Sequence, residues 1–340
     1  TLDLYCYEDT DGDGVSDKKT LWYKGGRRSG NLEHQPSGLI WSLDNWLYTT
    51  RSDFRLRYSD GKVIKNNILP NRGQWGLTQD NDGKPWYLNA GGEQGPTHFQ
   101  QRIHYGAYSF DGELKGSYKA VWPISGVPDV QAGPARLRAD NTLNHFTATC
   151  GPCVFRGDRL PAELVGDLFF AEPVGQLIRR TVIEKKEGIT YLSNPYENKK
   201  SEFIRSTDNN FRPVNMMNGP DGCLYIVDMY RGIIQEASWT GKGSYLRKMI
   251  KRYKLDENFG RGRIWRLRHK DFERGKEPKM LSETPSQLLE HLSHPNGWWR
   301  DTAQKLLVIK GDKSVVPALG KLVQEGKSVE ARLHALWTLD

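Results

Sequence analysis

The chain has 340 residues, of which 49 are Lys or Arg and 41 are Asp or Glu, so its formal net charge at pH 7 is +8. Hydrophobic residues make up 37% of the chain, and no apolar run approaches the length of a membrane-spanning helix, so we expect no membrane span. The 35 Gly and 17 Pro residues fit many turns between short strands.

The N-terminal segment is predicted to form two strands, Leu4–Tyr7 and Thr20–Tyr23, joined by an acidic turn. Four carboxylates stand at positions 1, 3, 5 and 9 of this turn, with Gly14 at position 6: Asp9, Asp11, Asp13 and Asp17. Hard oxygen ligands at this spacing suit Ca²⁺, although position 12 is Thr20 and the turn is therefore not a complete EF-hand. The alternative is a solvated acidic turn. Because so many neighbouring carboxylates would repel one another without a cation, we favour a calcium site.

A short unit then recurs along the chain, in which a Gly-Leu or Gly-Pro step, an Asp/Asn/Gly turn and a strand rich in Leu and Tyr follow one another. It is found at Gly38–Tyr48, at Gly76–Tyr87 and at Asn218–Tyr225, and the first two units are 38 residues apart. Recurring hairpins at this period are typical of the blades of a β-propeller. We therefore predict an all-β fold, a β-propeller, over residues 1–276.

Polar residues stand just before the repeated units, where the loops of a propeller converge on its axis. His34 precedes the first unit and could act as a general base or as a structural histidine. Arg72 and Gln74 precede the second unit, and Arg212 and Asn215 precede the third. Together these four residues would suit a planar polyanionic ligand, whereas each of them alone could simply cap a neighbouring blade.

Two further strand pairs are predicted, Gly166–Ala171 with Leu177–Ile183, and Cys223–Asp228 with Gly262–Leu267. Weaker strand and turn signals lie between Tyr105 and Leu143, at Tyr108–Phe110, Asp111-Gly112 and Ala135–Leu137. Glu172 follows a strand and could be either a pocket acid or a bridge between blades. Tyr245–Tyr253 has helical spacing and is predicted to form an inserted helix.

The cysteine pattern Cys150-Gly-Pro-Cys153 lacks the following histidine of a haem attachment site and a second pair for zinc. It precedes a strand and not a helix, which speaks against a redox-active dithiol. We expect either a local structural disulfide or two buried thiols.

Positive charge is concentrated between Lys242 and Lys276, where 13 Lys or Arg residues face four Asp or Glu residues. This segment could bind an anionic partner or could be a solvated connection between domains. We favour the connection and expect no nucleic-acid partner, because aromatic residues do not alternate with the charges as they do in stacking platforms.

After about Glu277 the pattern becomes helical. Thr284-Pro285 is a helix start, and further helices are predicted around Trp298–Leu307, Val315–Val323 and from Val329. Arg300-x-x-Ala303 returns as Arg332-x-x-Ala335, a step of 32 residues. We therefore predict that residues 277–340 begin a HEAT-like α-solenoid.

The segments Glu33–Leu39 and Asp44–Tyr48 resemble the part of soluble quinoprotein glucose and sorbosone dehydrogenases that carries the catalytic histidine. A fuller resemblance is to the large secreted "membrane-bound dehydrogenase" or haem-binding proteins of planctomycetes and verrucomicrobia. It rests on Thr207–Asn215, Asp228–Arg231 and Gly260–Leu267.

This resemblance implies a six-bladed propeller, partly represented with its first blade missing, which binds PQQ and Ca²⁺. It implies His34 as the catalytic base, and Arg72, Gln74 and Arg212 as cofactor contacts. The expected activity is periplasmic or secreted oxidation of a sugar or alcohol, with electrons passing to a cytochrome. Haem c would belong to a further C-terminal domain. A non-catalytic scaffold or glycan-binding protein is the alternative.

Overall fold

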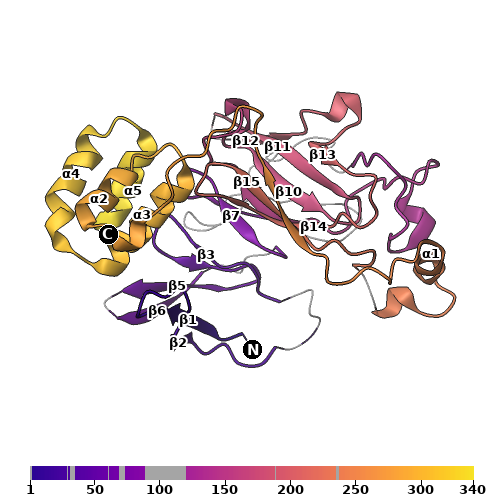
Figure 1. Cartoon of the computed structure of the whole chain (residues 1–340), viewed down its shortest axis with the longest axis horizontal. Coiled ribbons are helices and arrows are strands. Elements are labelled where there is room, and N and C mark those ends of the chain that lie inside the picture. Colours follow the sequence, from indigo (N-terminus) through magenta and orange to yellow (C-terminus); the bar gives the residue numbers. More distant parts are fainter. Residues whose placement is uncertain are drawn as a thin grey trace.

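The computed structural model describes residues 2–28, 30, 35–59, 61–68, 73–88, 120–187, 189–234 and 237–340. Antiparallel sheets fill the middle of the molecule, four α-helices gather at one end, and a single α-helix lies at the opposite end (Figure 1). The sequence prediction of a mainly antiparallel sheet protein with a helical C-terminal part is thereby confirmed.

The described strands form five sheets, and every strand pairing within them is antiparallel. Two strands form the first hairpin: β1 (Leu4–Glu8) and β2 (Lys18–Tyr23). The next sheet has four strands: β3 (Ile40–Trp41), β4 (Leu47–Tyr48), β5 (Phe54–Ser59) and β6 (Lys62–Asn67). A further hairpin joins β7 (Leu77–Gln79) to β8 (Pro85–Tyr87).

The two remaining sheets contain the best-packed core. The larger one contains β9 (Cys150–Val154), β10 (Leu168–Glu172), β11 (Leu177–Lys186), β12 (Ile189–Ser193) and β13 (Ile204–Arg205). The other contains β14 (Pro213–Asn218), β15 (Leu224–Asp228) and β16 (Arg263–Leu267). All five residues of β9 and of β10 are buried, which fits strands covered on both faces.

Local turn chemistry explains why the predicted hairpins form where they do. In the turn between β7 and β8, the carboxylate of Asp80 accepts hydrogen bonds from the backbone N–H groups of Asp82 and Lys84. Gly83 follows with φ +76°, a left-handed conformation that glycine adopts without strain. Asn45 has φ +62° in the corresponding turn between β3 and β4, and asparagine tolerates that region better than most residues.

The first strands of successive sheets lie side by side. A side-chain carbon added at Gly38 would lie 2.5 Å from the Cα atom of Gly76, and one added at Gly151 would lie 2.4 Å from the Cα atom of Asn215. The N–H of Gly151 also donates to the carbonyl of Trp75 at 3.0 Å. The sheets therefore converge at one edge, called here the axial edge, as successive blades of a propeller do. The six-blade count stays a prediction.

The helices have the bounds α1 (Tyr245–Tyr253), α2 (Pro285–His291), α3 (Gly297–Lys310), α4 (Val316–Glu325) and α5 (Val329–Leu339). Thr284 and Gln287 form a capping box at the start of α2, as the Thr-Pro signal predicts. Short 3₁₀ turns lie at 133–136, 162–164, 197–199, 237–240, 280–282 and 313–315. No helix in the described ranges is both long and apolar enough to cross a membrane. The HEAT assignment and the boundary near residue 277 stay predictions.

One strand prediction is wrong. Ala135–Leu137 is not part of a strand, because Gly133–Arg136 forms a 3₁₀ turn in which Pro134 fixes φ and lacks a hydrogen-bond donor. Only Leu137 makes an isolated bridge, to Leu143. The signals at Tyr108–Phe110 and Asp111-Gly112 lie outside the described residues.

Helices α2–α5 dock on the hairpin turns at the ends of the sheets. Asn296 and Trp299 donate to the carbonyls of Gly219 and Pro220 at 2.9 and 2.8 Å, and Gln304 donates to the carbonyl of Leu43 at 2.7 Å. The buried Arg156, which follows β9, makes a two-pronged ion pair with Asp301 at 2.6 and 3.0 Å. This contact joins the helical part to the sheets through buried polar groups.

Candidate functional site

The axial edge brings together the segments in which the site was predicted. Gln35–Gly38, Gly73–Gly76, Cys150–Pro152 and Pro213–Asn215 all lie there, at the starts of β3, β7, β9 and β14. The predicted base His34 and the predicted cofactor contact Arg72 lie outside the described residues. Gln35 follows His34 and Gly73 follows Arg72 in the sequence, and both Gln35 and Gly73 are at this edge.

A cavity of about 330 Å³ opens where the β1–β2 hairpin faces the sheet β3–β6, beside Pro36–Leu39. Most of its lining is apolar, with polar groups from Asp3, Arg28, Ser37 and Thr49. The carboxylate of Asp3 accepts from the N–H groups of Gly25 and Gly26, which fixes the chain at the rim of the cavity. A largely apolar cavity of this size with a few polar groups is typical of a small-molecule site.

Gln74 is buried at the axial edge, whereas Asn215 is exposed there. Gln74 is 6% exposed, and its backbone N–H donates to the carbonyl of Leu88 at 2.8 Å. Asn215 is exposed, and its side-chain oxygen accepts from the N–H of Met216. Of the described members of the predicted ligand set, Asn215 is therefore the one that faces solvent at the axial edge.

Arg212 is completely buried, and its guanidinium makes four hydrogen bonds and one ion pair within the protein. The side chain donates to four backbone carbonyls and pairs with a carboxylate: Pro173, Val174, Arg231, Gly232 and Asp129. In this state Arg212 therefore ties together the loops that follow β10 and β15. Its predicted contact with a cofactor stays a prediction.

Two buried carboxylates accompany this arginine. Burial raises the pKa of Asp129 to about 6, although the charge of Arg212 at 3.2 Å lowers it. Burial also raises the pKa of Glu172, which accepts hydrogen bonds from the N–H groups of Thr147, Ala148 and Val174. Glu172 therefore holds the backbone of the loop before β9 in place through these hydrogen bonds. Sequence reasoning missed Asp129, because nothing in its local sequence signals a buried partner for Arg212.

Binding of the predicted polyanionic cofactor requires cationic side chains at the axial edge. Among the described members of the predicted set, Arg212 is the one cation, and its buried guanidinium contacts groups of the protein. Asn215 offers an exposed amide. Arg72, the other predicted cation, lies outside the described residues, so PQQ binding stays a prediction.

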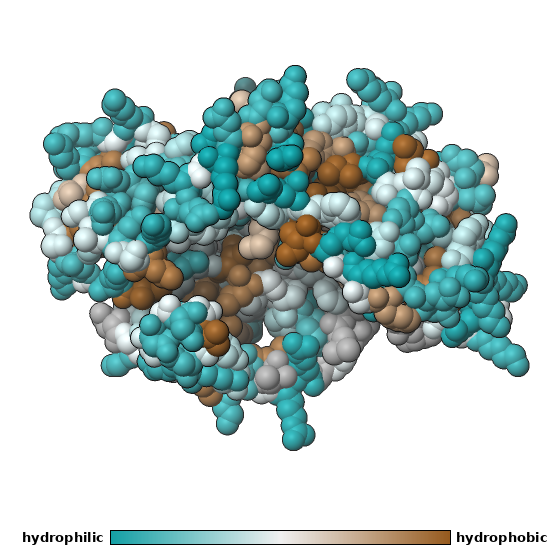
Figure 2. Space-filling view, in the orientation of Figure 1, coloured by the Kyte–Doolittle hydropathy of each residue, from teal (hydrophilic) through white to brown (hydrophobic). Residues whose placement is uncertain are grey.

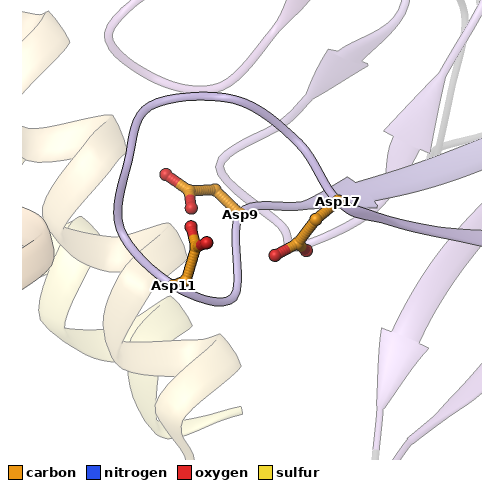
Figure 3. A group of neighbouring side chains, drawn as sticks. All are labelled: Asp9, Asp11 and Asp17. Atoms are coloured by element: carbon orange, nitrogen blue, oxygen red, sulfur yellow. The ribbon is translucent and has the colours of Figure 1, made fainter.

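The acidic loop between β1 and β2 forms a separate candidate site. One carboxylate oxygen from each of Asp9, Asp11 and Asp17 lies within 4.8 Å of the others; Figure 3 shows Asp9 and Asp11 facing each other within the loop and Asp17 at its base. Asp13 does not belong to this group; its carboxylate accepts from the N–H of Val15 at 2.7 Å.

Backbone geometry holds the loop in this shape. The two oxygens of Asp9 accept from the N–H groups of Gly12 and Gly14 at 2.7 and 2.9 Å. The hydrogen bond from Gly14 is the main reason that the pKa of Asp9 is lowered, so this carboxylate is ionised at neutral pH. Gly12 and Gly14 have φ +81° and +88°, conformations that favour glycine. An all-oxygen donor set of this kind fits Ca²⁺.

The cysteines are free thiols. Cys150 and Cys153 are buried in β9, and burial raises the pKa of Cys153 to about 12 and that of Cys150 as well. Of the two structural alternatives, buried thiols are the one that the structure shows. Thiols with raised pKa values are poor nucleophiles at neutral pH, as expected for a structural role.

Comparisons with known proteins place residues 1–271 in a family described as a domain of unknown function, DUF7133. No match was found among curated proteins. Virginiamycin B lyase from Staphylococcus aureus aligns over 63% of this chain with 15% identity and a TM-score of 0.33, and this chain spans about half of the lyase, 54%.

Two sugar dehydrogenases also align. A putative oxidoreductase (glucose dehydrogenase) from Thermus thermophilus has 14% identity and a TM-score of 0.31, over 62% of this chain and 82% of its own. The soluble aldose sugar dehydrogenase from Escherichia coli, in its apo form, has 15% identity and a TM-score of 0.21, over 57% of this chain and 41% of its own. At these low TM-scores, function has to be argued from the site itself.

Proposed function

This chain belongs to the DUF7133 family, a domain of unknown function, and we propose that it oxidises a sugar or a related alcohol at the axial edge. The observation that carries the proposal is the cavity of about 330 Å³ beside Pro36–Leu39, directly after the predicted base His34. Its volume suits a monosaccharide, and its polar groups Asp3, Arg28 and Ser37 could orient hydroxyls.

Oxidation of an alcohol removes a proton from the hydroxyl oxygen and a hydride equivalent from the carbon. His34 is the proposed acceptor of the proton, since an imidazole has a pKa suited to general base catalysis near neutral pH. The two electrons need a redox acceptor. PQQ or another redox cofactor is proposed for that role, with a cytochrome as the next electron carrier. The proposed location is periplasmic or secreted.

Ca²⁺ is proposed as a structural ion of the acidic loop. Asp9, Asp11 and Asp17 are the proposed ligands on the geometry of the described loop, and Asp13 could join them only if its carboxylate moved closer to this group. The loop is fully exposed. Its calcium would therefore stabilise the β1–β2 hairpin and take no part in the chemistry.

A second function is a scaffold or glycan-binding protein without catalysis. The observation that favours it is the state of Arg212, whose buried guanidinium is held by four hydrogen bonds and one ion pair to groups of the protein. The buried polar contacts between the helices and the sheets also suit a rigid scaffold.

The test is dye-coupled oxidation of a panel of aldoses, polyols and alcohols by the purified chain, after incubation with PQQ and Ca²⁺. Removing a general base lowers turnover by roughly 10²–10⁴-fold, so we expect His34→Ala to lose activity on that scale while its melting temperature stays the same. The matched control is His269→Ala, because His269 lies at the surface beside Asp271. A wild-type protein inert to every substrate and cofactor would favour the scaffold.

A further inference from the structure

The three segments Thr207–Asn215, Asp228–Arg231 and Gly260–Leu267, which are separate in the sequence, meet at one surface of the sheet β14–β16. Aromatic and arginine side chains of the last two segments, together with the preceding Phe259, form a cluster, called here the aromatic–arginine cluster: Tyr230, Arg231, Phe259, Arg263 and Trp265. The guanidinium of Arg263 lies 3.5 Å from the ring centre of Tyr230 and 5.5 Å from that of Trp265. Arg231 lies 5.5 Å from the ring centre of Phe259.

Hydrogen bonds hold the rings of this cluster in place. The hydroxyl of Tyr230 donates to Asp208 at 2.8 Å, and the indole N–H of Trp265 donates to Asp228 at 2.9 Å. The amide of Asn258 donates to the carbonyl of Tyr230 at 2.6 Å. Tyr230 itself has φ +47°, a conformation that costs energy in a residue other than glycine and that is found more often at functional sites.

The cluster is open to solvent. Trp265 is 44% exposed and Phe259 is 63% exposed. Strand β16 is the last strand in the order β14-β15-β16, so its outer edge has no partner strand among the described residues. A ligand can therefore reach both the aromatic rings and the arginines beside them.

The stretch of chain that contains β16 is strongly cationic, since residues 242–276 include 13 Lys or Arg residues and four Asp or Glu residues. Helix α1 contains Arg247, Lys248, Lys251 and Arg252 but no acidic residue, while Leu246 and Ile250 bury its other face. Figure 2 shows mainly hydrophilic side chains over the end of the molecule where α1 lies. The charge favours an anionic partner.

The combination of aromatic rings, guanidinium groups and carboxylates at the cluster indicates which kind of anionic partner it can bind. A sugar ring has a C–H face that packs on an aromatic ring, hydroxyls that donate to carboxylates and amides, and, in a uronic acid, a carboxylate that pairs with a guanidinium. Nucleic acid is a poorer match, because its dense phosphate charge would approach Asp208 and because Arg263 already covers one face of Tyr230.

We propose that the aromatic–arginine cluster is a binding site for an anionic glycan, with Arg263 as the residue that pairs with the sugar carboxylate. Aromatic residues do not alternate with the charges along the sequence, so the sequence pattern does not predict this site. The fold, and not the chain order, brings Tyr230 and Phe259 beside the arginines. Binding here needs no redox chemistry and is independent of the oxidation proposed at the axial edge.

The test is isothermal titration of the purified chain with tetragalacturonate, with neutral maltotetraose and with a short single-stranded oligonucleotide, each at low and moderate salt. We expect tetragalacturonate to bind and maltotetraose to bind at least roughly 10-fold more weakly, as loss of a charge-assisted hydrogen bond predicts. Equal binding of the neutral sugar, tighter binding of the oligonucleotide, or no binding of tetragalacturonate would overturn the proposal.

Two variants test the role of Arg263, and one serves as a matched control. Arg263→Gln should weaken tetragalacturonate binding by roughly 10-fold or more, and Arg263→Lys by less, because it keeps the charge but loses the planar stack on Tyr230. Arg268→Gln removes the same charge from an exposed position just past β16 and should change binding by less than about 2-fold, as for a distant surface charge. If Arg268→Gln weakened binding as much as Arg263→Gln at an unchanged melting temperature, the cluster would not be the site.

Discussion

Arg212 illustrates how one side chain can determine the structure around it. It is fully buried, it makes four hydrogen bonds and one ion pair, and its carboxylate partner Asp129 is fully buried too. We predict that Arg212→Ala lowers the free energy of unfolding by about 3–5 kcal/mol, because it removes the counter-charge of the buried Asp129 and the donors to four carbonyls. Urea denaturation of both proteins measures this difference.

The control for this prediction is another arginine ion pair that is not buried. Arg266 lies 3.2 Å from Asp221 and is 40% exposed, so Arg266→Ala should change the free energy of unfolding far less than Arg212→Ala does. Equal effects of the two substitutions would show that the Arg212 network does not contribute as its geometry indicates.

The residue scale is also where sequence reasoning reaches its limit. The pattern before Gly219 predicts a strand directly after Arg212, and β14 begins there, at Pro213. It does not reveal that Asp129, 83 residues earlier in the chain, is its partner. Such a pairing depends on how loops of different sheets meet, and no local pattern encodes it.

At the scale of elements, the β1–β2 hairpin makes a testable prediction about calcium. Binding at a free concentration of about 100 times the dissociation constant adds about 2.7 kcal/mol to the free energy of unfolding. We therefore expect Ca²⁺ to raise the melting temperature of the wild-type chain, and Asp11→Ala to abolish that rise, because it removes one of three converging carboxylates. Differential scanning calorimetry with and without Ca²⁺ measures both.

Asp13→Ala is the informative comparison for the calcium prediction, because the Asp13 carboxylate bonds to Val15 and lies outside the group of three. It should keep most of the calcium-induced rise. The same loss in both variants would mean that all four predicted ligands bind the ion. No calcium effect in the wild type would leave the loop as a solvated turn.

The elements themselves follow the sequence where turn chemistry is local. The Asp80–Gly83 turn, the Asn45 turn and the Thr284-Pro285 helix start are all found where the sequence predicts them. The strand predicted at Ala135–Leu137 does not form, because a strand signal of a few residues is weaker than the backbone constraint of Pro134. The docking of α2–α5 could not be predicted, because it pairs helix side chains with backbone carbonyls of the turns.

At the scale of the whole molecule, the contact between helices and sheets should depend on pH. His334 is fully buried; its Nδ1 lies 2.7 Å from Gln304 Oε1, and Gln304 in turn donates to the carbonyl of Leu43. Burial lowers the pKa of His334 to about 3, well below its ordinary value of 6.5. Between these two values the unfolded chain binds a proton that the folded chain does not, so stability falls as the pH falls.

A second, half-buried group of this interface, Asp301, acts in the same direction at lower pH. Burial raises the pKa of Asp301, but the charge of Arg156 and further contacts lower it more, so its pKa stays below the ordinary value. A carboxyl group with a lowered pKa stabilises the fold above its unfolded value, near 4, and this contribution is lost on further acidification. Acid should therefore loosen the helices from the sheets in two stages, His334 first.

We predict that the free energy of unfolding of the wild-type chain decreases by about 1.4 kcal/mol for each pH unit below about 6.5 through the histidine alone. His334→Gln removes the titrating group and can keep a hydrogen bond to Gln304, so its stability should depend less steeply on pH between about 6.5 and 4.5. His269→Gln, at an exposed position, should keep the wild-type slope. Urea denaturation at a series of pH values measures all three, and equal slopes for the wild type and His334→Gln would mean that His334 takes up its proton in the folded state as readily as in the unfolded one.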